Sequence, residues 1–132
     1  MGFLSGMDIS GSALTAQRLR MDIIAENIAN VETTRTEDGG PYRRKRVIME
    51  PRNPDFAETL QQRISGDPKA SVTGGVRVTG IVEDQSDFKL KYDPTHPDAD
   101  ENGYVQMPNV DLTLEMVDMI SAYRSYQANV TA

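Results

Sequence analysis

The C-terminal residues carry apolar side chains at alternating intervals of four and three positions. This spacing places the side chains on one face of a helix and is typical of a seam between packed helices. The pattern runs to Ala132 with no Gly or Pro to end it, so we interpret the last helix as truncated. The members of this stripe are Leu112, Met116, Met119, Tyr123, Tyr126 and Val130.

Other faces of the same helix are also apolar, because Val110, Leu114, Val117 and Ile120 lie outside the stripe. Burying the stripe contributes on the order of 10–15 kcal/mol. Ordering each backbone unit costs roughly 1–2 kcal/mol, so one seam does not offset the cost of ordering the helix. We therefore expect several helical neighbours, some from other chains. The alternative is that the terminal helices pack only on each other and on the middle of the same chain.

A second helical pattern occupies the N-terminal region. Its apolar row consists of Leu14, Met21 and Ile28, joined by Ile24. Asp8, Ser10 and Ser12 can accept backbone N–H bonds at the start of a helix. Asn30 can adopt the left-handed conformation that ends one. These signals predict a helix from about residue 8 to residue 30.

Two asparagines, Asn27 and Asn30, lie near the end of this N-terminal helix. Polar residues on a helix-packing face can fix the register of the packing at some cost in stability. The same residues can equally serve only to close the helix. Both interpretations stay open at this point.

The middle of the chain predicts a small β-rich domain. Residues 31–41 are polar and end in Gly39, Gly40 and Pro41, which favours a loop. Strands are expected at residues 42–49, 75–83, 88–92 and 104–107, with a bulge at Gly80 and one buried face on the strand that carries Leu90 and Tyr92. A short helix is expected at residues 56–64, within a segment, 51–71, whose structure the sequence leaves open.

Four consecutive basic residues, Arg43 to Arg46, lead into the first of these strands. Such a run usually lies on a solvated edge strand, where charge discourages aggregation between strands. A docking surface for an acidic neighbour is the alternative. We therefore predict an α+β fold in which long N- and C-terminal helices, 1–31 and 109–132, pair as a coiled coil and flank a small β-rich middle domain, 32–108.

Composition excludes several classes of function. The formal net charge is −6, which argues against nucleic acid as a partner. The chain has no Cys, so it has neither a disulfide framework nor a thiolate metal site. Charged residues interrupt the first thirty positions, and neither a cleaved secretory signal nor a membrane span is expected.

One segment resembles part of a calcium-binding loop. Asp98, Asp100, Asn102 and Gly103 match the first half of an EF-hand loop, but the twelfth position is Asn109 instead of Glu. A hydrated turn is therefore the preferred interpretation. His96 is the only histidine and is expected to be structural. No nucleophile or phosphate-binding motif occurs, so we expect neither enzymatic activity nor a cofactor or metal.

Three stretches together resemble the rod and hook family of bacterial flagellar axial proteins, and the resemblance is weakest between residues 51 and 71. They are Ser12 to Gln17 with Glu26 to Asn30, Gly75 to Val78 with Gly80 to Val82, and the run from His96 to Ala132. The third includes the segments His96 to Asp100, Pro108 to Val110, Glu115 to Ile120 and Tyr126 to Val130.

This resemblance implies a structural subunit of the flagellar basal-body rod, the drive shaft that crosses the periplasm and transmits motor torque. In the family, terminal helices stack into an inner tube and the β-rich middle faces outward. The implied partners are copies of the same chain, other flagellar rod proteins and the flagellar type III export apparatus, which exports the subunit without a cleaved signal peptide and without insertion into the membrane.

The residues assigned by this resemblance to axial helix packing are Leu14, Met21, Ile24, Asn27, Ile28, Asn30, Leu112, Met116, Val117, Met119, Ile120, Tyr123, Tyr126, Gln127 and Val130. The alternatives are a self-contained α+β adaptor and a weak calcium-binding module.

Overall fold

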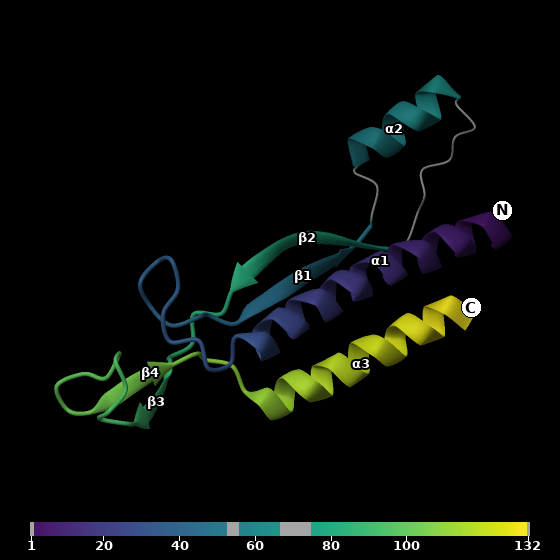
Figure 1. Ribbon diagram of the computed structural model, residues 1–132. Coiled ribbons are helices and arrows are strands. Elements are labelled where there is room, and N and C mark those ends of the chain that lie inside the picture. Colours follow the sequence, from purple (N-terminus) through teal and green to yellow (C-terminus); the bar gives the residue numbers. More distant parts are fainter. Residues whose placement is uncertain (1, 53–55, 67–74, 132) are drawn as a thin grey trace.

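The computed structural model describes residues 2–52, 56–66 and 75–131 of the chain. Its largest feature is a pair of helices, α1 (Gly2–Ala29) and α3 (Leu112–Thr131). The two helices lie side by side and run in opposite directions, so that both chain ends fall at the same end of the pair (Figure 1). The predicted terminal helices are therefore confirmed.

The strands form two small antiparallel sheets. In the first, β1 (Lys45–Pro51) pairs with β2 (Val76–Glu83) and packs along α1. In the second, β3 (Lys89–Tyr92) pairs with β4 (Tyr104–Met107) at the end of the molecule where α3 begins (Figure 1). The β-rich middle is thus a two-sheet region, and its first sheet shares a core with the N-terminal helix.

The predicted bulge in the first sheet is confirmed. Ile48 pairs with Gly80 and the next residue, Met49, pairs with Val78, so Thr79 has no partner in the register. An extra residue of this kind bends a strand and increases its twist. Both strands, β1 and β2, run alongside α1 (Figure 1).

The ends of α1 differ from the prediction. The helix begins at Gly2, and Asp8 therefore lies inside it and does not cap its start. Among the described residues no non-glycine residue has a positive φ, so Asn30 does not end the helix in the left-handed conformation. Its side-chain Nδ2 instead donates to the carbonyl of Glu26 at 2.8 Å. Ser12, also expected at the start, accepts the N–H of Val76 at 3.1 Å and ties α1 to β2.

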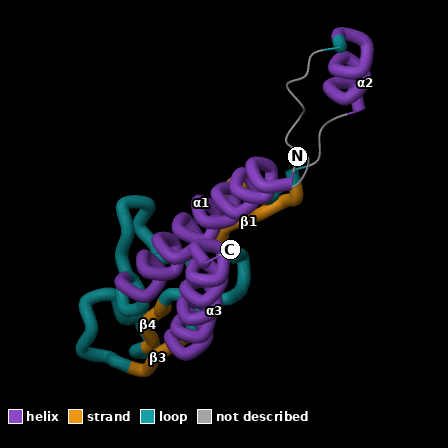
Figure 2. Tube along the Cα trace, turned by 90° about the vertical axis from the view of Figure 1, so that its right-hand side faces the viewer, coloured by secondary structure: helices purple, strands orange, loops and turns teal. Residues whose placement is uncertain are grey.

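The short helix α2 (Phe56–Ser65) confirms the helix expected at residues 56–64. It ends at Gly66, whose φ of 64° is typical of the residue that follows a helix. Among the described residues, α2 makes no contact with another helix or strand and lies apart from the helix pair (Figure 2). The other residues of the open segment, 53–55 and 67–71, lie outside the described residues.

The sheet of β3 and β4 does not bury the face that its alternation predicted. Leu90 and Tyr92 are 65% and 64% exposed, and the ring of Tyr92 contacts Tyr104 edge to face at 5.3 Å. The buried residue of this sheet is Val105, on the opposite face. The prediction was wrong because Lys91, not Leu90 or Tyr92, pairs with the buried Val105. All four residues of β3 are exposed, and Lys89 Nζ donates to the carbonyl of Val110 at 3.1 Å.

Candidate functional site

The face that α3 presents to α1 is small and polar. Glu115 and Ala122 are 1% and 0% exposed, and Asp118, Ser125 and Asn129 on the same side are half-buried. These positions recur at intervals of three and four, so they form one face of the helix. The most buried positions of α3 are thus a charged and a small residue, and Met119 and Tyr126 beside them are half-buried as well.

The apolar stripe predicted to be the seam is largely open to solvent. Met116 is 50% exposed, and Leu112, Tyr123 and Val130 are also exposed, whereas Met119 and Tyr126 are half-buried. The assignment of this stripe to packing against several helical neighbours stays a prediction, and within the subunit its half-buried members, Met119 and Tyr126, lie beside the buried Glu115 and Ala122 on the helix surface. Pairing of α1 and α3 as a coiled coil through apolar seam positions is therefore not confirmed. Val117, Ile120 and Gln127 are exposed as well.

The predicted packing residues on α1 differ in how far the rest of the chain buries them. Ile24 is buried, together with Ala16 and Ile23, which the sequence did not single out as site residues. Leu14, Met21 and Ile28 are half-buried. This apolar row is therefore only partly covered by the rest of the chain.

Asn27 is the buried polar residue that joins α1 to the first sheet. Its Nδ2 donates to the carbonyl of Lys45 at 2.8 Å and to Glu115 Oε2 at 3.3 Å. Its Oδ1 accepts the N–H of Lys45 at 2.9 Å and the hydroxyl of Tyr42 at 2.8 Å. The side-chain amide of Asn27 thus bonds both the N–H and the carbonyl of Lys45, as the backbone of a neighbouring strand would. The interpretation that Asn27 fixes register fits this geometry, whereas Asn30 makes only local bonds.

Glu115 connects α3 to Asn27 and to Arg44, which directly precedes β1. Its carboxylate accepts a charge-assisted hydrogen bond from Arg44 Nε and pairs with that guanidinium. The same Arg44 side chain reaches Asp84 at 3.4 Å and Asp118 at 3.6 Å. Hydrogen bonding to Glu115 is the main reason that the pKa of Arg44 is raised. We call Asn27, Tyr42, Arg44 and Glu115 the polar clamp, because together they hold α1, β1 and α3 in one register.

Asn109 adds further hydrogen bonds around the polar clamp, of which Tyr42 is a member. Asn109 Oδ1 accepts the N–H of Arg44 at 2.8 Å, and its Nδ2 donates to the carbonyls of Asp84 and Ser86. Burial, with the nearby Glu26, raises the pKa of Tyr42 to about 12. The phenol therefore remains protonated at neutral pH and keeps donating its hydrogen bond.

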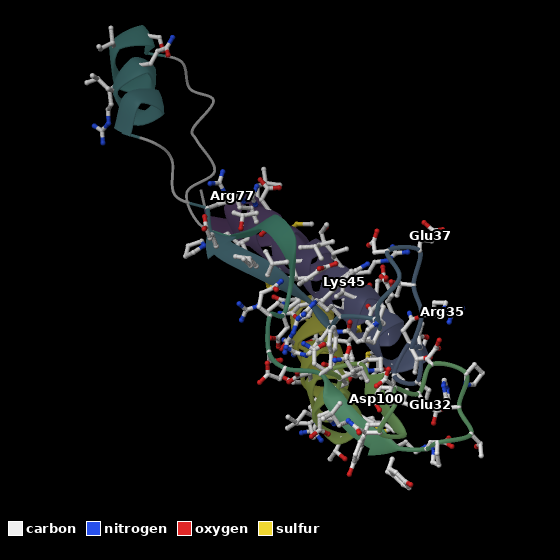
Figure 3. All side chains as sticks on the ribbon, turned by 90° about the vertical axis from the view of Figure 1, so that its left-hand side faces the viewer. Glu32, Arg35, Glu37, Lys45, Arg77 and Asp100 are labelled. Carbon is white, nitrogen blue, oxygen red and sulfur yellow. The ribbon has the colours of Figure 1, made fainter. Side chains whose placement is uncertain are left out.

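The basic run is not the solvated edge that the sequence predicted. The guanidinium carbon of Arg43 lies 4.3 Å from the centre of the Phe88 ring, and Lys45 Nζ pairs with Glu26 at 2.9 Å. With Arg44 in the clamp, Arg46 is the exposed member of the run. Arg44 and Lys45 thus pair with carboxylates of the same chain, which sequence spacing alone does not reveal. Lys45 lies within the body of the molecule, away from Arg35 and Asp100 at the loop end (Figure 3).

The segment that resembled a calcium loop is a turn with internally bonded oxygens. Asp98 pairs with Arg35 and accepts the hydroxyl of Thr34 at 2.7 Å. Asp100 Oδ1 accepts the backbone N–H groups of Asn102 and Tyr104, both at 2.9 Å. Among the residues that the structure describes, no group of three or more His, Cys, Asp or Glu is placed to hold a metal.

Gly103 and His96 complete this turn. Gly103 has a φ of 84°, and a Cβ there would lie 3.0 Å from the ring of Tyr92, so the turn requires glycine. His96 Nδ1 accepts the N–H of Asp98 at 3.0 Å, a structural role.

The lowered pKa values of two carboxylates, Asp84 and Asp98, predict how the stability of the folded protein depends on pH. Hydrogen bonds from Ser86, then from Arg44, lower the pKa of Asp84 below its ordinary 3.8, and a hydrogen bond from Thr34, then one from Arg35, lowers the pKa of Asp98. A depressed folded-state pKa contributes stability that is present above pH 3.8 and is lost as pH falls through the lower folded value. We expect the Tm to fall below about pH 4. An Asp84→Asn variant measured by circular dichroism should show a flatter acid limb, and an unchanged limb would contradict this assignment.

Within the described ranges, no helix combines the length and apolarity needed to span a membrane. What the fold presents is a pair of terminal helices locked by buried polar bonds, with apolar side chains left on the outside of α3. Exposed apolar surface of this kind marks a protein that functions in contact with other proteins. The class defined by fold and site is a structural assembly subunit.

Comparison with known proteins gives the family. Residues 7–35 match the model described as "Flagella basal body rod protein", and residues 101–132 match "Flagellar basal body rod FlgEFG protein C-terminal". The flagellar basal-body rod protein FlgC of Borreliella burgdorferi is 52% identical over 99% of this chain and 88% of the relative. The FlgC of Bacillus subtilis is 51% identical over 96% and 85%, and that of Aquifex aeolicus 42% over 100% and 87%.

The chain belongs to the FlgC family of flagellar basal-body rod proteins. It is a structural subunit of the bacterial flagellar rod, located in the basal body, and the family is not enzymatic. Membership implies assembly with other flagellar rod components. The adaptor and calcium-binding alternatives are not supported.

Proposed function

We propose that this subunit polymerises through its two terminal helices, contacts copies of itself and adjacent rod proteins, and transmits motor torque. The observation that carries the proposal is the distribution of side chains on α3, where a charged and a small residue face inward and apolar residues face outward. Its inward face carries Glu115 and Ala122, while its outward faces carry Met116, Val117 and Ile120. Exposed apolar side chains cost solubility and become favourable when a neighbouring surface buries them.

The polar clamp suits a subunit that carries torque. Close-packed and fully hydrogen-bonded contacts deform little under load. Asn27 of α1 makes four hydrogen bonds, two with Lys45 of β1, one with Glu115 of α3 and one with the loop residue Tyr42, so the helices and the first sheet move as one body. A rigid subunit passes torque to its neighbours with little internal twisting.

The division into terminal helices 1–31 and 109–132 around a middle region 32–108 is part of the same proposal. The terminal helices supply the axial contacts, and the middle region stabilises them from one side through β1. Export by the flagellar type III apparatus without a cleaved signal completes the proposal, in keeping with the rod location of the family.

A substitution in α3 tests the assembly surface. Val117 is 57% exposed, so Val117→Asp should leave the isolated subunit folded but place a charge in a buried contact of the rod. We expect loss of motility and no rods in cells that carry only the variant, with unchanged circular dichroism of the purified protein. Met119→Asp should have the same effect, although Met119 is half-buried in the subunit.

The matched control is Asn102→Asp, which adds the same charge on an exposed turn away from the terminal helices. Motility should be retained in this variant. Normal motility of Val117→Asp would show that this part of α3 is not an assembly contact.

A further inference from the structure

The turn between β3 and β4 carries the one Asn–Gly pair of the chain, Asn102–Gly103. The other asparagines precede Ile, Val or Pro, and they are Asn27, Asn30, Asn53, Asn109 and Asn129. A β-branched side chain crowds the peptide nitrogen of its own residue and Pro has no N–H, whereas Gly leaves its nitrogen open to a neighbouring side chain. Asn102 is therefore the asparagine whose side chain is attacked most readily by the next peptide nitrogen.

Such an attack converts asparagine to an acid without an enzyme. The nitrogen of Gly103 loses its proton and bonds to Cγ of Asn102, and the side-chain nitrogen takes up a proton and leaves as ammonia. Water then opens the cyclic imide. Cleavage of the new bond gives aspartate, and cleavage of the original peptide bond gives isoaspartate, whose main chain is lengthened by a carbon. Asn102 is exposed, so water reaches its amide.

The folded turn holds the attacking nitrogen away from this chemistry. Gly103 is buried, its N–H donates to the carbonyl of Asp100 at 3.0 Å, and its carbonyl accepts the N–H of Asp93 at 2.9 Å. The side chain of Asp100, at the loop end of the molecule (Figure 3), accepts the N–H groups of Asn102 and Tyr104 on either side. A nitrogen engaged as a donor keeps its proton, and a peptide fixed from both sides does not turn toward Cγ.

We propose that Asn102 is a site of spontaneous deamidation and that folding of the β3–β4 turn controls its rate. The reaction is slow in the folded subunit, where Asp100 holds the turn closed, and fast in a chain that has not folded or whose turn has opened. It needs only water and the atoms of one chain, so the proposal stands independently of assembly through the terminal helices.

The two products differ in their effect on the fold. Aspartate keeps the length of the main chain and lies at an exposed position, so the turn can still close. Isoaspartate displaces Gly103, and there is no room beside it, since a Cβ at Gly103 would lie 3.0 Å from the ring of Tyr92 and 3.1 Å from Pro94. A chain that forms isoaspartate while unfolded therefore cannot close this turn. Chemical change of the unfolded chain thus makes the loss of the subunit irreversible.

Peptide mapping by mass spectrometry measures the conversion at each asparagine. The purified full chain is kept folded in buffer, or unfolded in guanidinium chloride, at the same mildly alkaline pH and temperature. We expect Asn102 to be the first asparagine converted, and to convert about tenfold faster or more in the unfolded chain, because the rate follows the population of open turn. Equal rates in the two conditions, or faster conversion at another asparagine, would overturn the proposal.

Two variants separate the role of the turn from that of the nitrogen. Asp100→Ala removes the acceptor for two N–H groups and should raise the rate at Asn102 in the folded subunit about fivefold, with no change in guanidinium chloride. Glu101→Ala is the matched control, because it removes an exposed neighbouring carboxylate but neither of these bonds, and should leave both rates unchanged. Gly103→Val, measured in guanidinium chloride where no fold is needed, should nearly abolish the conversion. A parental rate in folded Asp100→Ala, or undiminished conversion in Gly103→Val, would overturn the proposal.

Discussion

Replacing Glu115 with Ala should destabilise the folded subunit by about 3 kcal/mol, because one partner of a buried ion pair is removed. The side chain of Glu115 is 1% exposed and its loss leaves Arg44 and Asn27 Nδ2 with one fewer acceptor. Arg44 keeps Asp84 as a partner, so we expect the lower end of the range for broken buried pairs. Urea unfolding followed by circular dichroism measures the change.

Asp118→Ala is the matched control. Asp118 lies one turn further along α3 and contacts the same guanidinium at 3.6 Å, but its side chain is 39% exposed. Partly exposed pairs contribute less than about 1 kcal/mol. Equal destabilisation by the two variants would show that Glu115 is not the residue that fixes α3.

Asn27→Ala should destabilise the subunit by a similar amount, about 3 kcal/mol, because it leaves several buried groups without partners. The N–H and carbonyl of Lys45 and the hydroxyl of Tyr42 each lose a hydrogen bond. For a domain of this size we expect the Tm to fall by about 10 °C. Differential scanning calorimetry measures both the Tm and the enthalpy of unfolding.

Asn30→Ala provides the comparison within the same helix. Asn30 bonds only to Glu26 and Thr33, both within four residues. Its loss should cost less than about 1 kcal/mol, since the nearby groups can turn to water. If both variants lost the same stability, the register role assigned to Asn27 would be wrong.

The elements of the fold were predictable because each has a local signal. The spacing of Leu14, Met21 and Ile28 identified one terminal helix, and the stripe from Leu112 identified the other. Gly80 marked the bulge and Gly103 the turn, since each sits where the backbone departs from a regular strand.

The orientation of α3 could not be predicted, because the usual rule that apolar residues face the chain's own core fails for this helix. Met116 and Ala122 belong to different faces, and sequence spacing does not say which neighbour each face has. Glu115 lies far in sequence from Asn27 and Arg44, so the clamp had no local signal. Glu115, which the sequence did not single out, is the residue of α3 that contacts Asn27 of α1.

The sequence predicted that α1 starts at about residue 8, which is too late, because local signals do not show which tertiary partner a side chain has. Phe3, Leu4 and Met7 are exposed and continue the helix beyond the capping residues that the sequence offered. Ser12, expected to cap, is used instead to bind β2. Capping side chains are therefore ambiguous when a tertiary partner competes for them.

Amide deuterium exchange tests most directly the claim that the terminal helices complete their packing only in the rod. The dilute subunit and basal bodies that contain it should be compared over residues 2–29 and 112–131. We expect protection near the polar clamp in both, with fast exchange toward the outer ends of α1 and α3 in the dilute subunit that becomes slow in the rod. Equal protection of both helices throughout, with and without assembly, would contradict the account.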